Sequence, residues 1–381
     1  MNKEKSLLCV ANWDSNVGYA WWLMESFWAE IARNFNDKYR IVLAYPSVSQ
    51  IPKVIEMSNI DVKKFNFGKE GVKGWFQTLR FIRKEKIQVI YFSDKPAFSL
   101  NYFFYRVIGV KKIIVHDHTP GERKAPEGFK KAVKCLRARL PWVNVDAVIG
   151  ATDFVKYRNI KVGCVRKEKC YSAPNGIPMD FGEGDIRADL KEMFGIRKNR
   201  RIIISVGRAN FYKGIDFALY VINRLVNTKG MRNIHYIHVG DGPDMDKFKK
   251  LSRQLELDEH VTFAGRQTDV SNMLKQCDIA IHPSKGEVGY SLSIIECMKI
   301  GLPVVVPDNP SVCSATLDHV TGMIYKDGDL SSASNGVLTL LRDDVLRNKI
   351  SRCSKKIAAE KYSIEACHEK FNTIITEILD S

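Results

Sequence analysis

The residues best suited to chemistry lie in the segment PSKGEVGYSLSIIECMKIGLPVVVP (283–307). An apolar run that ends at Ile281 predicts a strand, and a loop with Glu287 leads from it to a helix that opens near Leu292. The first amides of a helix have no partners within it and carry a partial positive charge, so this arrangement favours a bound phosphate. Glu296, one turn inside the helix, can accept hydrogen bonds from a diol such as a ribose.

A second candidate group follows the predicted strand Arg201–Val206. Arg208 and Lys213 share the loop after this strand, at the carboxyl edge of the sheet, where open α/β folds bind ligands. A planar guanidinium and a compact ammonium suit a diphosphate. They would also offset the charge that develops on a nucleoside diphosphate leaving group. By itself, however, such a pair is more often a pair of exposed surface residues.

A third group, His116-Asp117-His118, follows the predicted strand Lys112–Val115. Two histidines at this spacing could cap a loop or bind a metal, but no third metal ligand is apparent nearby. Two Asp-x-Asp patterns, Asp244–Asp246 and Asp327–Asp329, have the composition of turns or helix starts. We therefore expect no bound metal and no other cofactor.

Short apolar runs alternate with longer amphipathic runs, which predicts α/β domains with doubly wound parallel sheets. The predicted strands are Leu7–Ala11, Arg40–Ala44, Val89–Phe92, Lys112–Val115, Asp146–Ile149, Arg201–Val206, His235–Val239, Val261–Phe263, Asp278–Ile281 and Pro303–Val306. This alternation of predicted strands and helices is interrupted at Ser172–Gly184, which is rich in proline and glycine. We take this segment as a linker between two Rossmann-like domains, 1–175 and 176–358, and 359–381 as a final amphipathic helix.

Size and composition fit this organisation, because 381 residues accommodate two domains of ordinary size. No run approaches the ~18 consecutive apolar residues of a membrane span, and the first apolar run is too short for a signal peptide. The nine cysteines form no Cys-x-x-Cys pair, which favours reduced thiols over disulfides or zinc. We expect a cytoplasmic protein, peripheral on the inner face of the cytoplasmic membrane.

Positive charge is concentrated in the first half of the chain. Residues 1–175 hold 31 Lys and Arg against 16 Asp and Glu, whereas the remainder is nearly neutral, and all six tryptophans lie in the same half. Basic residues interleaved with aromatic ones suit an anionic membrane surface. They would also suit nucleic acid, but no nucleic-acid-binding motif is visible, and we expect no such partner. A solvated basic face over an aromatic core is the alternative.

One predicted helix, Gly128–Trp142, concentrates these features. Its apolar residues share one stripe, and lysines and arginines cover the rest. The stripe consists of Phe129, Val133, Leu136 and Leu140. Such a helix can lie in a lipid headgroup layer with its apolar face down. It could equally be a surface helix that packs on the sheet.

Five segments together resemble the retaining family-4 glycosyltransferases with the GT-B fold. They are PNGI (174–177), VGRANFYKG (206–214), VGDGP (239–243), VTFAG (261–265) and PSKGEVGYSLSIIECMKIGLPVV (283–305), in that family's order and spacing. The resemblance runs from about Asp146 to the end of the chain. It implies two Rossmann-like domains facing a cleft, a last helix that crosses back to the first domain, and metal-independent sugar transfer from a nucleotide-sugar donor with retention.

The resemblance also implies a donor site, chiefly on the second domain. Its predicted members are Gly18, Arg208, Lys213, Gly240, Gly265, Ser291, Leu292 and Glu296. Arg208 and Lys213 would contact the diphosphate, Glu296 the ribose, and Gly265 the base. The predicted catalytic residues are His116, Glu287, Arg208 and Lys213. His116 would face the reacting sugar, with His118 as the reserve.

The chain departs from the family pattern at three places. Val288 occupies the position of the first of two acids, and Glu287 lies one residue early. The usual Gly-Gly after the first strand is Val17-Gly18, and the acid before a late Asp-Gly-x-x-Gly turn is absent. A bulge in the loop could bring Glu287 back to the sugar.

These expectations define a hexosyltransferase that moves a sugar from a UDP- or GDP-linked donor to an acceptor hydroxyl. The acceptor would be lipid-linked or a saccharide, in bacterial cell-surface polysaccharide, lipopolysaccharide or glycolipid synthesis. Two alternatives share the fold: a nucleotide-sugar 2-epimerase, and a catalytically weak binding subunit.

Overall fold

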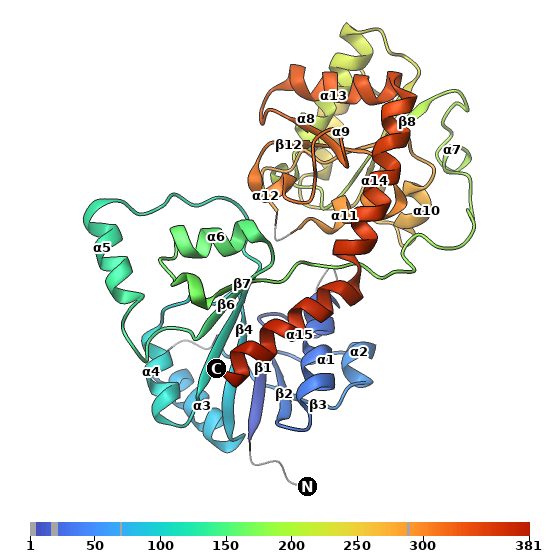
Figure 1. Ribbon diagram of the computed structural model, residues 1–381. Helices are drawn as coiled ribbons and strands as arrows, with labels where there is room; N and C mark the ends of the chain where they lie inside the picture. The colour runs from blue at the N-terminus through green and yellow to red at the C-terminus, as the bar shows by residue number, and fades with distance from the viewer. Residues whose placement is uncertain (1–4, 17–21, 69–70, 288–289) are drawn as a thin grey trace. The chain divides into compact units, whose positions relative to one another are not determined.

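The computed structural model describes residues 5–16, 22–68, 71–287 and 290–381 (Figure 1). By their internal contacts the residues divide into two compact units: Met1–Asn175 with Cys367–Ser381, and Gly176–Ala366. The division after Asn175 falls inside the segment that the sequence indicates as a linker. Each unit contains one fully parallel sheet, so the predicted class of two Rossmann-like α/β domains is confirmed.

The first unit is built on a seven-stranded sheet in the order β3-β2-β1-β4-β5-β6-β7. Its strands are β1 (Ser6–Val10), β2 (Arg40–Tyr45), β3 (Ile60–Lys64), β4 (Ile87–Ser93), β5 (Lys112–Asp117), β6 (Ala147–Gly150) and β7 (Cys170–Ser172). The inner strand β1 is buried along its whole length. Burial on both faces explains why such strands read as unbroken apolar runs.

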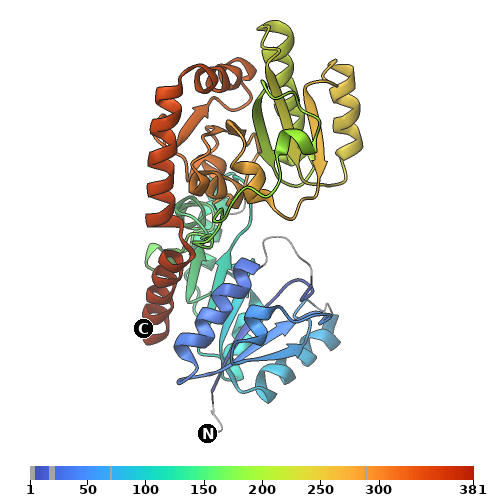
Figure 2. The same ribbon diagram turned by 90° about the vertical axis from the view of Figure 1, so that its right-hand side faces the viewer.

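Helices cover both faces of this sheet, as Figures 1 and 2 show. The helices of this unit are α1 (Trp22–Phe35), α2 (Lys53–Glu56), α3 (Gly71–Lys84), α4 (Leu100–Val107), α5 (Gly128–Arg137), α6 (Asp153–Lys161) and the final α15 (Ile364–Asp380). Helix α5 contributes no buried residue to either face. Leu7 and Cys9 belong to the core that α1 and α15 close, whereas Leu8 and Val10 belong to the core that α3 and α4 close. The strand period of two produces this division.

The second unit is built on a six-stranded sheet in the order β10-β9-β8-β11-β12-β13. Its strands are β8 (Arg201–Val206), β9 (Ile234–Val239), β10 (Val261–Gly265), β11 (Ile279–Ile281), β12 (Val304–Pro307) and β13 (Gly322–Tyr325). Its helices are α7 (Leu190–Met193), α8 (Ile215–Asn223), α9 (Met245–Gln254), α10 (Val270–Leu274), α11 (Leu292–Ile300), α12 (Pro310–Cys313), α13 (Leu330–Arg342) and α14 (Asp344–Tyr362). Two cores, one on each face, fill the space between the sheet and these helices.

Several elements differ from the prediction. Helix α5 ends at Arg137 rather than at Trp142, and Pro141 disfavours helix in the residue before it. The last predicted helix is interrupted at Ser363, whose extended backbone separates α14 from α15. There Ile177 bonds to the chain on both sides of the break, donating to Tyr362 and accepting from Ile364. Three strands, β3, β7 and β13, were not predicted because they are short or partly exposed.

All nine cysteines are free thiols, as their scattered spacing indicates. Across the described ranges, no helix combines the length and the apolar character needed to cross a membrane.

Candidate active site

The strand order of the second unit reverses between β8 and β11, which lie side by side at its centre. In open α/β sheets, ligands bind outside the carboxyl ends of the strands at such a reversal. The loop after β8 carries Arg208 and Lys213, and the loop after β11 carries Glu287 and leads into α11. Both predicted loops therefore lie at the expected place in this unit.

Lys213 and Glu287 form the central contact of this site. The Lys213 ammonium lies 2.7 Å from each carboxylate oxygen of Glu287. The Glu287 side chain is only 6% exposed, and that of Lys213 is 25% exposed. The Nε2 atom of His282 lies 2.7 Å from the same carboxylate, and the Ser291 hydroxyl lies 3.3 Å from that nitrogen. One buried carboxylate thus fixes the position of the ammonium.

The positive charge of Lys213 strongly affects the pKa of Glu287. Burial alone raises the pKa of Glu287, but the charge of Lys213 and the contacts with His282 outweigh it and lower the pKa to about 2. Glu287 is therefore ionised at neutral pH, and it pairs with Lys213 rather than pointing into open space. Glu287, one residue early relative to the family pattern, has Lys213 and His282 as its partners.

The two loops are held together by backbone contacts. Lys213 closes a single 3₁₀ turn that Asn210 caps, because the Asn210 side chain accepts from the Lys213 amide at 3.1 Å. Gly214 follows with a φ of +70°, and a Cβ there would lie 2.0 Å from the Pro283 carbonyl oxygen. The Lys285 amide donates to the Tyr212 carbonyl at 2.9 Å. A glycine after Lys213 is thus required for the close approach of the two loops.

The other predicted glycines have different surroundings. A Cβ at Gly240 would lie 1.9 Å from the Gly207 carbonyl oxygen, so Gly240 lets the end of β9 pack against the loop after β8. Gly265 has a φ of +65°, and a Cβ there would meet nothing within 4 Å. Gly265 therefore borders open space, whereas Gly240 is needed for packing.

Helix α11 begins at Leu292, as predicted, with Ser291 at its N-cap position. Ser291 is buried and Leu292 partly buried. The Glu296 carboxyl is partly buried in the first turns of this helix, and burial raises its pKa to about 7. Within the described residues, nothing donates a hydrogen bond to this carboxyl. Such an acceptor matches a ligand that brings hydroxyl donors.

Two predicted donor-site residues, Arg208 and Gly18, remain. Arg208 is exposed directly after β8 and Gly207. Gly18 lies outside the described residues, as does Val288, which occupies the position of the usual first acid.

In the first unit, His116 does not lie at a surface. Its side chain is fully buried, its Nδ1 lies 2.5 Å from the Tyr91 hydroxyl, and its ring packs against Phe27 of α1 and Phe371 of α15. Burial holds the pKa of His116 well below its usual range. The expectation that His116 faces a sugar is corrected, because strand β5 directs this side chain into the α1–α15 core.

A polar cluster lies beside His118 at the ends of β4 and β5, and of its members only Asp117 belongs to a group that the sequence analysis names. Asp94, with a φ of +55°, accepts from the His118 amide at 2.6 Å. Asp117 pairs with Arg158 at 3.2 Å and accepts from Asn159 at 2.7 Å. Burial raises the pKa of Asp94, whereas for Asp117 the hydrogen bonds and the Arg158 charge outweigh burial and lower it.

Two of these residues could have been found from the sequence. His282 comes directly after the predicted strand Asp278–Ile281, and Asp94 comes two residues after Val89–Phe92. Side chains at the carboxyl ends of such strands gather at one sheet edge. Arg158 gave no such signal, because it lies inside a helix.

Comparison with known proteins gives one matching family model, Glycosyl transferases group 1, over residues 186–357. The chain is 23% identical over 295 residues to the UDP-Gal:alpha-D-GlcNAc-diphosphoundecaprenol alpha-1,3-galactosyltransferase of Escherichia coli, covering 75% of this chain and 74% of that relative. It is 22% identical over 190 residues to the N-acetyl-alpha-D-glucosaminyl L-malate synthase of Bacillus anthracis, covering 50% and 49%. The chain thus spans about half the length of the second relative.

Solved structures show the same fold over the whole chain. A glycosyltransferase from Rickettsia africae superposes with a TM-score of 0.78 at 16% identity, covering 100% of this chain and 99% of that one. Anabaena HepE, solved with UDP and glucose, superposes with a TM-score of 0.75 at 18% identity, covering 98% and 99%. Residues 186–357 are therefore a glycosyl transferases group 1 domain, in a GT-B-fold chain that is a homologue of glycosyltransferases.

Proposed function

We propose that this protein is a retaining, metal-independent glycosyltransferase with a nucleotide-sugar donor, UDP- or GDP-linked, and an acceptor hydroxyl. The observation that carries the proposal is the Lys213–Glu287 pair, held at the strand-order reversal of a glycosyl transferases group 1 domain. A fixed ammonium at a sheet edge, next to a helix N-terminus, suits a diphosphate ester.

In this proposal the second unit binds the donor. Arg208 and Lys213 contact the diphosphate, and the amides at Ser291 and Leu292 contribute further donors. The Glu296 carboxylate accepts from the ribose hydroxyls, and the open space beside Gly265 admits the base.

The reaction then follows from where the charges lie. The bond between the anomeric carbon and the leaving phosphate oxygen breaks, and the acceptor oxygen bonds to the same face of that carbon. The acceptor proton passes to the leaving phosphate oxygen, so no separate base is required. Lys213 and Arg208 stabilise the charge that develops on the diphosphate, as preorganised cations do. Glu287 acts as a positioning residue, because it contacts Lys213 and His282.

The relatives guide the choice of pathway and acceptor. The E. coli relative is named for a diphosphoundecaprenol-linked acceptor. A lipid-linked or saccharide acceptor, in bacterial cell-surface polysaccharide, lipopolysaccharide or glycolipid synthesis, is consistent with that similarity.

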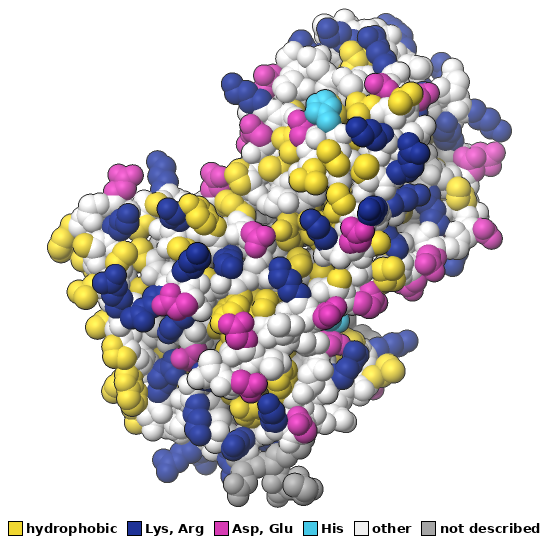
Figure 3. Space-filling view, in the orientation of Figure 1, with side chains coloured by type: hydrophobic (Ala, Val, Ile, Leu, Met, Phe, Trp, Pro, Cys, Tyr) yellow, Lys and Arg dark blue, Asp and Glu magenta, His cyan; other side chains and the backbone are white. Residues whose placement is uncertain are grey.

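An anionic membrane surface is the proposed location of the acceptor, and an exposed apolar surface of the first unit supports it. No residue of α5 is buried: Phe129 is 84% exposed and Leu136 65% exposed. The rings of Phe76, Trp75, Phe104, Phe103 and Trp142 contact one another in series, which extends this surface over α3 and α4. Figure 3 shows hydrophobic and basic side chains interspersed there. Such a mixture is typical of membrane-surface helices.

The tryptophans divide between two environments. Trp13 and Trp28 are buried and stack at 5.7 Å in the α1 core, so they have a structural role. Trp142 is 54% exposed and belongs to the apolar surface. The concentration of tryptophan in the first half is therefore only partly relevant to a membrane.

A panel of nucleotide sugars tests the proposal. Thermal shift reports donor binding, because a ligand of the folded state raises the melting temperature. Released nucleotide and the anomeric configuration of the product, with and without EDTA, report transfer, retention and metal independence. An epimerised sugar formed from donor alone would favour the epimerase. Nucleotide binding without release from any donor and acceptor would favour the binding subunit.

A further inference from the structure

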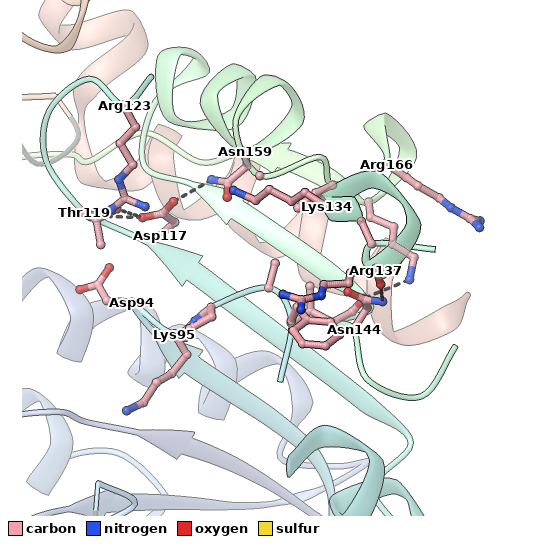
Figure 4. Close-up of a pocket in the computed structure, with 18 residues that line it drawn as sticks. Asp94, Lys95, Asp117, Thr119, Arg123, Lys134, Arg137, Asn144, Asn159 and Arg166 are labelled. Atoms are coloured by element: carbon pink, nitrogen blue, oxygen red, sulfur yellow. Dashed lines mark hydrogen bonds between the residues drawn. The ribbon is translucent and has the colours of Figure 1, made fainter. Parts of the chain in front are cut away.

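The first unit contains a pocket of about 500 Å³ that none of the predicted site residues lines. Figure 4 shows it between the ends of β4 and β5, helix α5, and the segment around Asn159. One wall is rigid, because residues 97–99 pair with residues 143–145: the Val145 amide donates to the Ala97 carbonyl at 3.0 Å and the Ser99 amide donates to the Val143 carbonyl at 2.9 Å. Regular backbone contacts therefore hold this wall of the pocket in place.

The lining is strongly cationic. Its positively charged members are Lys95, Arg123, Lys134, Arg137, Arg166 and Lys169. Among the described residues, none of these six side chains forms an ion pair with a carboxylate. Two carboxylates line the pocket, and one of them, Asp117, already pairs with Arg158. Unpaired cations that converge on one cavity attract an anionic group.

Charge is distributed unevenly along the pocket. Figure 4 shows Asp94 and Asp117 toward one end, together with Lys95 and Arg123, and the cations Arg137 and Arg166 toward the other. At the cationic end, the Lys169 ammonium donates to the Val145 carbonyl at 3.0 Å, and burial lowers its pKa. A bound anion would compensate that burial.

Apolar groups border the cationic end. Phe98 lines the pocket, with the Arg137 guanidinium carbon 5.8 Å from its ring centroid. Helix α5 contributes Lys134 and Arg137 to the lining, while its Phe129 and Leu136 are exposed. A ligand with a charged head in the pocket could therefore extend an apolar chain over α5.

We propose that this pocket binds the phosphate or diphosphate group of an amphiphilic acceptor, with Lys134 and Arg137 as its principal contacts. The assignment to an acceptor rests on the proposed function, whereas the anion-binding chemistry follows from the lining residues. The hydroxyl-bearing part of the acceptor would then lie toward Asp94, at the carboxyl edge of the sheet, where Rossmann-like domains bind ligands.

Direct binding of geranyl diphosphate, measured by titration calorimetry on the full chain, tests this proposal. The lining variant is Lys134→Gln with Arg137→Gln, and the matched control is Lys130→Gln with Lys131→Gln. The control loses the same charge from the same helix but lies outside the lining. All four side chains are exposed, so both variants should fold, which thermal melting checks. We expect the lining variant to bind on the order of 100-fold more weakly, about tenfold per lost charged contact, and the control nearly as wild type.

Further probes separate the sources of the anion. Inorganic diphosphate should bind more weakly than geranyl diphosphate, and geraniol should not bind. The two variants should bind equally well to vesicles that contain phosphatidylglycerol. A loss of vesicle binding specific to the lining variant would make a lipid headgroup the occupant and overturn the acceptor assignment.

Three results would overturn the pocket itself: no binding of geranyl diphosphate, equal weakening in both variants, or unchanged affinity in the lining variant. The last would place the probe elsewhere, for example at the donor site. These outcomes are independent of the donor panel. If the protein turns over a donor but its affinity for geranyl diphosphate is unchanged in the Lys134→Gln, Arg137→Gln variant, the pocket proposal is refuted and the proposed transferase activity stands. If geranyl diphosphate binding depends on Lys134 and Arg137 but no donor is turned over, the proposed transferase activity is refuted and the anion-binding pocket stands.

Discussion

Lys213 contacts both carboxylate oxygens of Glu287 at 2.7 Å, although 74 residues separate the two in the chain. The pair joins the loop after β8 to the loop after β11, at the reversal of strand order. Because Glu287 is buried and also bonded to His282, the ammonium has one well-defined position. Preorganisation of this kind is what a diphosphate leaving group requires.

Replacing Lys213 by alanine should slow sugar transfer by about 10²- to 10³-fold, the scale for the loss of one preorganised charge donor. Initial rates of nucleotide release at saturating donor measure it. Lys285→Ala is the matched control, because Lys285 is an exposed cation in the neighbouring loop. Near-normal turnover in the Lys213 variant would contradict the assignment.

Replacing Glu287 by glutamine should reduce stability in a pH-dependent way. Its pKa in the folded state, about 2, lies below the ordinary 4.5, so the carboxylate contributes stability above pH 4.5. That contribution declines as pH falls from 4.5 toward 2. We expect the variant to lose about 2 kcal/mol at pH 7, because a partly buried cation loses its partner. Urea unfolding at pH 7 and pH 3.5 measures this; a difference that does not shrink at the lower pH would refute the pairing.

Glu296 should make donor affinity depend on pH. A carboxyl with a pKa of about 7 must be ionised to accept from two ribose hydroxyls. Affinity should therefore fall by up to tenfold for each pH unit below about 7. In Glu296→Gln the affinity should be lower at pH 8 and independent of pH between 6 and 8. Titration calorimetry with the nucleotide identified by the panel measures this, and an unchanged pH profile in the variant would exclude the ribose contact.

The same substitution should stabilise the protein without ligand. The pKa in the folded state exceeds the ordinary 4.5, so the folded state holds this proton more tightly than the unfolded state. Wild-type stability therefore declines as pH rises from 4.5 to about 7, and Glu296→Gln escapes the decline. At pH 8 the variant should be more stable by about 2 kcal/mol. Thermal melting at pH 5 and pH 8 checks the sign: the difference should appear only at pH 8.

Replacing Gly214 by alanine should disrupt the loop that carries Lys213. The added Cβ would lie 2.0 Å from the Pro283 carbonyl oxygen, so the backbone must move, at a cost of more than about 3 kcal/mol. Gly230→Ala is the control: its φ of +68° is similar, but a Cβ there meets nothing within 4 Å. Only left-handed strain, about 1 kcal/mol, should affect the control. Equal destabilisation of the two variants would show that the contact between the loops is unimportant.

The exposed stripe of α5 should govern vesicle binding. Phe129→Ser with Leu136→Ser removes apolar area worth about 1.5–3 kcal/mol per side chain if it is buried in lipid, so flotation with phosphatidylglycerol vesicles should fall at least tenfold. Met193→Ser with Val345→Ser is the control, because these residues are also exposed but lie in the second unit. Equal flotation of both variants would place the membrane contact elsewhere.

Much of the fold could be read from the sequence, because local patterns encode it. Buried parallel strands appear as apolar runs, and β8 was predicted with its observed bounds, Arg201–Val206. Strand β3 was missed because its residues are only partly buried, so no apolar run marks it. The extent of α5 was overestimated because an amphipathic stripe continues beyond the point where the helix ends.

The candidate site, like the fold, could be predicted only in part from the sequence. The sequence placed Lys213 and Glu287 in loops after strands, but their direct contact could not be read from it. Nor could the direction of His116, because the side of the sheet that a residue faces depends on strand register. The convergence of α5 cations on one pocket with residues that follow β4 and residues that precede β6 also required the folded chain.

By itself, the sequence determined the two parallel α/β domains, the positions of the chemically suited loops and the excess of cations in the first half. These features depend on residue type, period and local spacing, which are properties of short segments. Only the tertiary structure decided that Glu287 orients Lys213, that His116 belongs to the core, and that a cationic pocket lies beneath α5. Each of these depends on packing between segments far apart in the chain, and short segments carry no record of the residues that they meet.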